Sequence, residues 1–227
     1  SALPGTSTQL GAGSALPNHK GGVHGTVYVA GPAATGSTLA SRIPVPDHTM
    51  RLLDSTTGAL VAEATTDVFG RYYFPPQELG VYSLTWQLQS GWRGGAYADP
   101  LVIEKGTVTP DQVRLRPVPG NVVVVGTVTL RDGSTAGIID EYFGLEVTPE
   151  VSLSGLTGAP IAGPVRANAG GGYALSGRAQ QAAVRLEARV EAASSSRSIS
   201  FRKGPPQVQD VALPNTAPRI NELYLAD

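Results

Sequence analysis

Apolar and polar residues alternate, position by position, along most of this chain. The clearest run extends from Gly80 to Leu88, and its large apolar positions are Tyr82, Leu84, Trp86 and Leu88. Because successive side chains of a β-strand point to opposite faces, this pattern predicts a strand that turns those four residues toward a core. Similar runs rich in Val and Thr, such as 122–130, recur between clusters of turn-forming residues. The pattern therefore predicts many short strands.

One segment has the composition of a helix. Residues 182–193 contain Ala, Arg, Glu and Leu, which are good helix formers. The same segment nevertheless alternates Val184, Leu186, Ala188 and Val190 with mostly charged residues. We therefore predict a strand here as well, and negligible helix in the chain as a whole.

The chain repeats itself once. Gly25-Thr26-Val27 recurs as Gly126-Thr127-Val128, and Gly70-x-Tyr72 recurs as Gly171-x-Tyr173 at the same offset. Landmarks in the same order indicate two copies of a module of about 95 residues. About seven short strands with turns between them are typical of an antiparallel β-sandwich. The predicted fold class is therefore all-β, with two tandem antiparallel β-sandwich domains. The glycine that opens each copy is expected to allow a bend or bulge.

Segments of different composition bound the two copies. Residues 1–22 are dominated by Ser, Thr, Gly, Ala and Pro, which bury too little apolar surface to offset the entropy of ordering. Two prolines restrict the joint between the copies and favour modules placed end to end. The predicted segments are a low-complexity arm or linker over 1–22, module 1 over 23–117, a Pro-rich joint over 118–121, module 2 over 122–214, and a linker with the start of a further module over 215–227.

Charge and composition exclude several classes of function. The 227 residues carry 17 basic and 18 acidic side chains, a net charge of −1, which gives no basic surface for nucleic acid. The longest apolar run, 122–125, is far shorter than the roughly 18 residues that a membrane helix needs. Cysteine is absent, so neither a disulfide nor a thiolate nucleophile is available. The 28 glycines and 18 prolines favour turns over long helices.

The repeated motifs resemble those of a known family. The first copy reads Gly25-Thr-Val27, Thr66-Asp-Val-Phe-Gly70-Arg-Tyr72-Tyr-Phe74 and Gly80-Val-Tyr82-Ser-Leu84. The second keeps Gly126-Thr-Val128 and Gly171-Gly-Tyr173-Ala-Leu175, but lacks the Gly-x-Tyr before its long strand. Both copies resemble the carboxypeptidase regulatory-like, or transthyretin-like, β-sandwich module, whose relatives include the Cna-B-type repeats of bacterial surface proteins. This resemblance implies a fold more strongly than a function.

Physical reasons account for the central motif. Gly70 and Gly171 lie where a hairpin requires a positive φ, which glycine adopts without steric cost. Tyr72 and Phe74 share one face of their strand and are expected to fill the core.

Two activities of the relatives are not expected in this chain. Some relatives form an internal Lys–Asn isopeptide bond, which needs a lysine on an early strand. The three lysines, Lys20, Lys105 and Lys203, fall in the predicted arm and in late loops. Enzymes of the carboxypeptidase family carry zinc ligands in a separate catalytic domain, and no His-x-x-Glu pair occurs here.

Catalytic and metal sites are not predicted. His19, His24 and His48 have no accompanying nucleophile motif, so no catalytic residue is assigned and the protein is not expected to be an enzyme. Clustered loop carboxylates would suit calcium, but no Asp-x-Asp-x-Asp run occurs, and lone Asp side chains cap turns. No metal or other cofactor is predicted. The loop carboxylates are Asp47, Asp54, Asp67, Asp132, Asp140, Glu141 and Glu150.

The loop from Gly91 to Tyr97 carries the candidate ligand contacts. Trp92 and Tyr97 offer aromatic faces for a sugar ring, and Arg93 offers a forked donor. The corresponding part of the second copy, 193–197, has no aromatic residue. The competing interpretation is that Trp92 fills the core beneath the loop, and the sequence leaves both interpretations open.

Together these observations predict a non-catalytic structural or interaction segment of a larger exported bacterial protein. It would act as a stalk, spacer or adhesion-type module outside the cell or at the cell surface. The alternative is a carbohydrate-binding accessory module of a secreted enzyme, and calcium-dependent adhesion is a third, less favoured class. The expected partners are other domains of the same parent protein and protein or glycan ligands. Neither nucleic acid nor a membrane span is expected.

Overall fold

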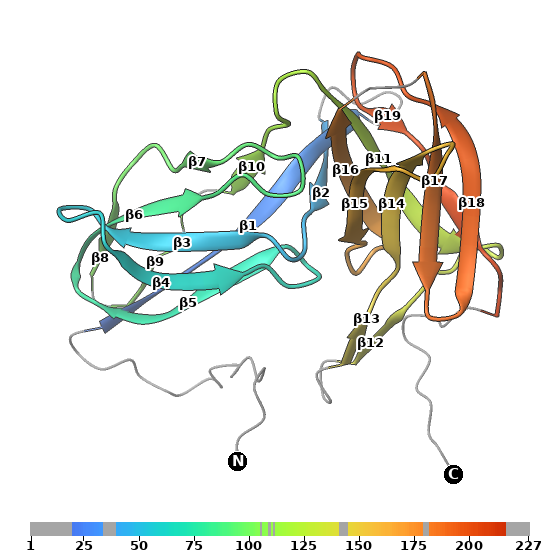
Figure 1. Ribbon diagram of the computed structural model, residues 1–227. Helices are drawn as coiled ribbons and strands as arrows, with labels where there is room; N and C mark the ends of the chain where they lie inside the picture. The colour runs from blue at the N-terminus through green and yellow to red at the C-terminus, as the bar shows by residue number, and fades with distance from the viewer. Residues whose placement is uncertain are drawn as a thin grey trace, which may run out of the picture.

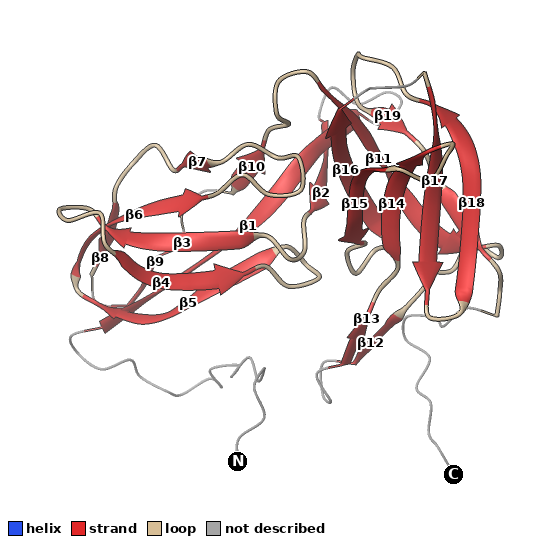
Figure 2. Cartoon of the chain, viewed as in Figure 1, coloured by secondary structure: helices blue, strands red, loops and turns tan. Residues whose placement is uncertain are grey.

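The computed structural model describes residues 20–33, 40–104, 106–108, 110, 112–140, 145–178 and 182–216. These residues form strands joined by turns, and no helix occurs among them (Figure 1, Figure 2). The all-β fold class predicted from the alternation is thus confirmed. The arm over 1–19 and the start of a further module beyond residue 216 lie outside the described residues, as do Glu141 and Lys105.

The first half of the chain folds into two five-stranded sheets. In one, β1 pairs with β2, β5, β9 and β10; in the other, β3 and β6 are central, with β4 beside β3, and β7 and β8 beside β6. The strands are β1 (Lys20–Ala33), β2 (Ala40–Pro44), β3 (Thr49–Asp54), β4 (Leu60–Thr65), β5 (Arg71–Glu78), β6 (Gly80–Trp86), β7 (Gly95–Ala96), β8 (Leu101–Ile103), β9 (Gly106–Val108) and β10 (Val113–Leu115).

The second half folds into two four-stranded sheets and a small hairpin. One sheet has the order β16-β11-β19, with β20 also paired to β11, and the other has the order β15-β14-β17-β18; β12 and β13 form the hairpin. The strands are β11 (Asn121–Leu130), β12 (Ile138–Asp140), β13 (Leu145–Val147), β14 (Glu150–Gly155), β15 (Pro160–Arg166), β16 (Gly172–Arg178), β17 (Ala183–Val190), β18 (Ala193–Ser200), β19 (Gln207–Val208) and β20 (Val211–Leu213).

The two halves repeat one pattern of strand pairing. β1 is antiparallel to β5 and parallel to the closing strand β10, with Val27 opposite Val113. In the same way β11 is antiparallel to β16 and parallel to β20, with Val128 opposite Val211. The sequence repeat is therefore a repeat of topology. Residue alternation does not predict the parallel pairs, because it carries no information about the direction of a neighbouring strand.

Each half encloses an apolar core between its two sheets. The first core takes side chains from β1, β3, β5, β6, β8 and β10, and the second from β11, β14, β16, β17, β18 and β20. Tyr72 and Phe74 lie in the first core as predicted, with their rings edge to face and the centroids 5.7 Å apart.

Strand β11 begins between the two cores. Val122 and Val124 belong to the second core, whereas Val123 and Val125 pack into the first. Both faces of this strand are therefore buried at its start, which explains why four consecutive valines occur here without a polar residue.

A glycine faces a tyrosine across each central strand pair. Gly25 lies opposite Tyr72, and Gly126 lies opposite Tyr173. A Cβ on Gly25 would come within 2.5 Å of the Tyr72 hydroxyl oxygen, and a Cβ on Gly126 would overlap the carbonyl oxygen of Gln209. The expectation of a bulge at these two positions was wrong, since both are in register. The glycines instead give clearance to the ring and to the neighbouring backbone.

Two local predictions are confirmed by the backbone. Gly70 and Gly171 both adopt a positive φ, 71° and 77°. The helix-like segment over 182–193 contains strand β17, whose buried positions alternate from Val184 to Val190.

The alternation that begins at Gly80 ends earlier than predicted. β6 stops at Trp86, whose side chain is only partly buried, and Leu88 is 68% exposed. Trp86 lies at the end of the sheet, opposite Gly95, and its indole Nε1 donates a hydrogen bond to the carbonyl of Arg93, 3.2 Å away. The chain then leaves the sheet, so the core has no place for Leu88.

Strand β1 starts at Lys20, ahead of the position 23 predicted for the first module. An early strand therefore does carry a lysine, contrary to the expectation from sequence. The ammonium nitrogen of Lys20 lies 3.4 Å from a carboxylate oxygen of Glu78, and both side chains are substantially exposed. The contact is thus an ordinary surface ion pair with a carboxylate.

Candidate functional site at the junction of the two halves

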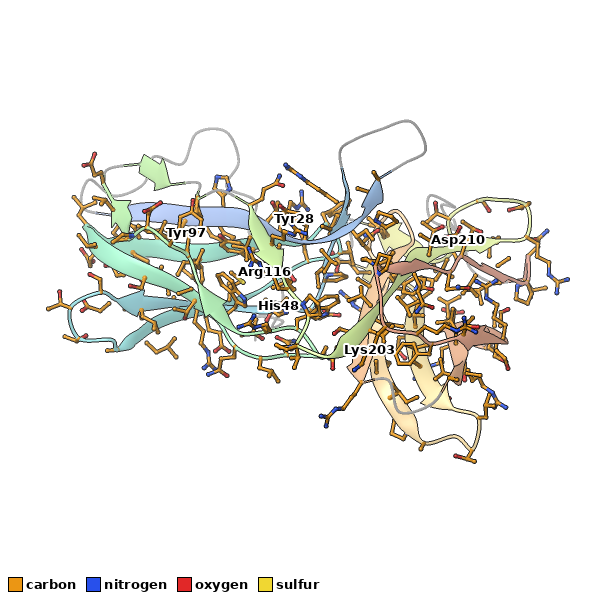
Figure 3. All side chains as sticks on the ribbon, turned by 90° about the horizontal axis from the view of Figure 1, so that it is seen from above. Tyr28, His48, Tyr97, Arg116, Lys203 and Asp210 are labelled. Carbon is orange, nitrogen blue, oxygen red and sulfur yellow. The ribbon has the colours of Figure 1, made fainter. Side chains whose placement is uncertain are left out.

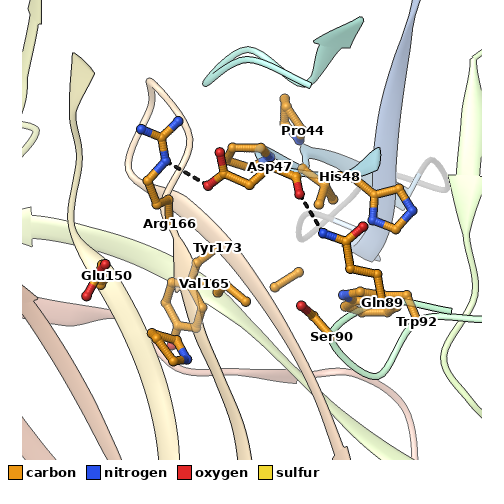
Figure 4. Close-up of a pocket in the computed structure, with 14 residues that line it drawn as sticks. Pro44, Asp47, His48, Gln89, Ser90, Trp92, Glu150, Val165, Arg166 and Tyr173 are labelled. Atoms are coloured by element: carbon orange, nitrogen blue, oxygen red, sulfur yellow. Dashed lines mark hydrogen bonds and ion pairs between the residues drawn. The ribbon is translucent and has the colours of Figure 1, made fainter. Parts of the chain in front are cut away.

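A cleft of about 480 Å³ lies between the two halves of the chain (Figure 4). The first half contributes the loop Pro44–His48 and the turn Gln89–Trp92, and the second contributes parts of β14, β15 and β16. Pockets for small ligands occur preferentially at such boundaries between domains, so this cleft is the candidate binding site.

Trp92 forms the apolar side of the junction. Its backbone N–H donates to the Gln89 carbonyl, 2.8 Å away, and it forms a β-bridge with Pro117 at the joint between the halves. The side chain is 1% exposed and belongs to the same apolar cluster as Val123, Val125 and Ala174 of the second half. The first core therefore extends across the junction into the second half.

The carbonyl oxygen of Gly91 is the polar centre of the junction. It accepts hydrogen bonds from the backbone N–H of Val118 at 3.0 Å, the Ser176 hydroxyl at 2.8 Å and the Asn121 amide at 3.3 Å. Gly91 has a φ of 82°, and a Cβ at this position would overlap the Ser176 carbonyl. Only glycine allows the two backbones to approach this closely.

A second group of contacts lies at the other rim of the cleft. The Asn168 side-chain amide donates to the Pro44 carbonyl at 3.2 Å, and the Ala169 N–H donates to the Val68 carbonyl at 2.9 Å. The guanidinium of Arg166 pairs with the Asp47 carboxylate at 2.7 Å, as Figure 4 shows. These contacts join the hairpin turns of the two halves on the side away from Gly91.

His48 is a buried, uncharged imidazole beside the cleft. Its side chain is 2% exposed, and its Nε2 has no hydrogen-bond partner among the described residues. Burial lowers the pKa of His48 from 6.5 to about 4, because the charged form loses its hydration. The backbone around it is unusual, since the neighbouring Asp47 and the facing Ser90 both adopt a positive φ, 57° and 49°.

A serine, a histidine and an aspartate therefore line one cleft, but they are not linked as a proton relay. Such a relay requires the histidine to hydrogen-bond both the nucleophile and the carboxylate. The Asp47 carboxylate binds Arg166 instead, and Nε2 of His48 has no hydrogen-bond partner in the part of the chain that the structure describes. Gln89 contributes to this arrangement by donating to the Asp47 carbonyl at 2.6 Å. The geometry holds the loops in place and does not activate Ser90.

The structure separates the three ligand-contact residues predicted from the sequence. Trp92 is turned into the junction and has no exposed face, which agrees with the competing interpretation as a core residue. Tyr97 is partly buried against the first core. Arg93 alone is exposed, in a different hollow from the cleft. The three side chains therefore do not form one aromatic binding surface.

Sequence reasoning missed the residues that build the junction. These residues are Gly91, Asn168, Ser176 and Arg166. Their types are common in turns and strands, so the sequence gives no sign that they meet. The prolines of the joint indicated a restricted angle, but the contacts that set the angle come from segments far apart in the sequence.

The described part of the chain contains neither a cluster of metal-ligating side chains nor a helix that could span a membrane. No cluster of three or more histidine or acidic side chains suited to a metal ion occurs there. Asp54 and Asp132 cap their own turns, accepting hydrogen bonds from Thr57 and Ser134. No helix in that part is long and apolar enough to cross a membrane.

Comparison with known proteins gives a limited result. No protein-family model matches the sequence. No curated protein matches it either.

Several solved structures show a loose likeness. The Bacillus anthracis TIE protein is 13% identical with a TM-score of 0.36; the match covers 87% of this chain and 34% of that protein, so this chain spans about a third of its length. The shaft pilin SpaA from Lactobacillus rhamnosus GG is 11% identical with a TM-score of 0.32, over 86% of this chain and 97% of the pilin. A proposed carbohydrate-binding protein from Bacteroides uniformis is 8% identical with a TM-score of 0.34. The match covers 80% of this chain and 99% of that protein. All three TM-scores are below 0.5, so these likenesses carry no argument about function.

Proposed function

We propose that this chain is a non-catalytic structural or adhesion-type segment of an exported bacterial surface protein. In this proposal, module 1 (23–117) and module 2 (122–214) hold neighbouring parts of the parent protein at a fixed angle. The observation that carries the proposal is the junction, where Trp92 shares one buried apolar cluster with Val123, Val125 and Ala174 of the second half.

The physical argument starts from the usual behaviour of linked domains. Interfaces between domains of one chain are commonly small and polar, so relative motion is the default. Here the apolar core runs across the boundary, and strand β11 buries its side chains in both cores. Rotation about the joint would disrupt the cluster around Trp92 and remove the two donors that the second half gives to the Gly91 carbonyl, Asn121 and Ser176. The contacts therefore favour one orientation, in which the halves meet at an angle (Figure 1).

The same proposal includes the family to which each half belongs. The repeated Gly-x-Val and Gly-x-Tyr motifs support a carboxypeptidase regulatory-like or transthyretin-like module, because the glycine and tyrosine positions meet across the central strands in both halves. We place the segment outside the cell or at the cell surface, with other domains of its parent protein as its first partners. The unlinked side chains of Ser90, His48 and Asp47 support a role without catalysis.

A distance measurement between spin labels tests the fixed angle. The chain has no cysteine, so Thr56→Cys in the first half and Ser196→Cys in the second, both exposed, accept labels at these sites alone. A rigid junction gives one narrow distance distribution, and Trp92→Ala broadens it. Leu130→Ala is the matched control, since it truncates a buried side chain of the second core alone and should leave the distribution narrow. A broad distribution in the wild-type chain would overturn the proposal.

A further inference from the structure

A second hollow, of about 340 Å³, lies on the first half and shares no lining residue with the cleft. It is formed by the end of β6, by β7 with the residues before it, and by β10 with the residue that follows. Arg93, Arg114 and Arg116 line it together with Trp86, and glycines 94 and 95 form part of its wall. Figure 3 labels Arg116, the last of the three arginines, beside β10.

The three arginines meet because of local structure. In β10 the side chains of Val113 and Leu115 are buried, so Arg114 points outward, and Arg116 lies two residues further on the same side. The backbone N–H of Arg93 donates to the Arg116 carbonyl at 2.8 Å, which ties the glycine-rich loop to the end of this strand. A Cβ on Gly95 would lie 2.8 Å from the Trp86 ring, so the glycines let the loop lie close to the indole.

The charge of this hollow is unbalanced. Within the described residues, none of the three guanidinium groups has an ion-pair partner, and no carboxylate lines the hollow. Four arginines elsewhere, Arg51, Arg71, Arg166 and Arg189, pair with an acidic side chain, and others such as Arg185 stand singly on the surface. Three positive charges that line one hollow with no carboxylate beside them in the described part of the chain repel one another, and a bound anion would relieve this repulsion.

We propose that this hollow is a binding site for an acidic saccharide, one that carries carboxylate or sulfate groups. Planar guanidinium forks match the oxygens of these groups and can hold them through paired hydrogen bonds. Trp86 is partly exposed at the same place, and an indole supplies an apolar surface for the C–H groups of a sugar ring. The aromatic wall favours a saccharide over an acidic peptide. This inference goes beyond the proposed structural role and does not depend on the fixed angle.

Binding is tested by calorimetric titration of the whole chain. The probes are an oligogalacturonate, which carries carboxylates, a heparin-type oligosaccharide, which carries sulfates, a neutral galactose oligomer of equal length, and poly-glutamate. We expect at least one acidic saccharide to bind, the neutral oligomer not to bind, and the affinity to fall between about 20 mM and about 150 mM NaCl because salt screens exposed charges.

Substitutions locate the site. Arg93→Gln, Arg114→Gln and Arg116→Gln are each expected to weaken binding roughly tenfold or more, because each removes a charge-assisted fork. Arg185→Gln is the matched control, since Arg185 is an exposed arginine of β17 that makes no ion pair within the described residues. Thermal unfolding of every variant checks that it is folded. A further variant combines the three substitutions at Arg93, Arg114 and Arg116. The proposal is overturned if no acidic saccharide binds at low salt, or if this combined variant binds like wild type. It is also overturned if poly-glutamate binds as tightly as the saccharides.

Discussion

Neighbouring residues of the loop from Gly91 to Tyr97 have opposite environments. Trp92 is 1% exposed and belongs to the junction, whereas Arg93 is exposed and lines a separate hollow. From the composition of the loop alone, these two side chains are expected to belong to one binding surface. The backbone separates them, because Gly91 has a positive φ and the Arg93 N–H is held by the Arg116 carbonyl.

Substitution of the two tryptophans should give unequal losses of stability. Trp92→Ala removes a fully buried ring and is expected to lower the free energy of unfolding by about 3–5 kcal/mol. Trp86→Ala removes a partly exposed ring and should cost clearly less, which replaces the expectation from sequence that Trp86 is the buried tryptophan. Urea denaturation of both variants measures the difference. Equal losses would contradict this account of the junction.

His48 should make the stability of the chain depend on pH. Its folded pKa, about 4, lies below the unfolded value of 6.5, so the uncharged imidazole stabilises the fold fully above pH 6.5. This contribution, about 3 kcal/mol, is lost as the pH falls from 6.5 through 4. We expect His48→Gln to lose less stability between pH 7 and pH 4.5 than wild type, measured by urea denaturation. His24→Gln, at an exposed histidine, serves as the control for the loss of an imidazole side chain.

Strand β11 is the element on which the architecture depends. It is the central strand of its own sheet, it pairs with β16, β19 and β20, and it buries side chains in both cores. A strand buried on both faces consists of apolar residues without alternation, as Val122 to Val125 do. The absence of polar residues from this short run is thus explained by the burial of both faces of the strand.

Gly126 in β11 should not tolerate a side chain. A Cβ here would overlap the backbone carbonyl of Gln209 and lie 3.1 Å from the ring of the buried Tyr173. We expect Gly126→Ala to cost about 1–3 kcal/mol of stability or more. Gly170→Ala is the control, because a Cβ there would meet only the Asn168 side chain, at 3.5 Å. Thermal unfolding distinguishes the two, and a stable Gly126→Ala variant would refute the clearance argument.

At the scale of the whole molecule, the two sandwiches share an apolar cluster and several hydrogen bonds at the junction. The Asp47–Arg166 pair is 50% and 28% exposed, so it contributes little, and the buried apolar contacts around Trp92 contribute most. A high salt concentration should therefore leave the angle between the halves unchanged.

Thermal unfolding should reflect this shared core. We expect the two halves to unfold in a single calorimetric transition, because loss of either half exposes apolar surface of the other. Trp92→Ala is expected to split the transition into two, with the Arg166→Gln variant as a control that keeps one. Two separate transitions in the wild-type chain would mean that the junction does not couple the halves.

The sequence by itself determined the fold class, the repeat and much of each core. Strand alternation, the positive-φ glycines at 70 and 171, and the burial of Tyr72 and Phe74 follow from local steric rules and from residue spacing. Only the tertiary structure decided which side chains meet across long separations. Trp92 reaches Val123, Ser176 reaches Gly91, and Arg93 joins Arg114 and Arg116 through pairings between separate segments. Spacing along one strand fixes the face on which a side chain lies, whereas its neighbours depend on how the sheets and the two halves pack together.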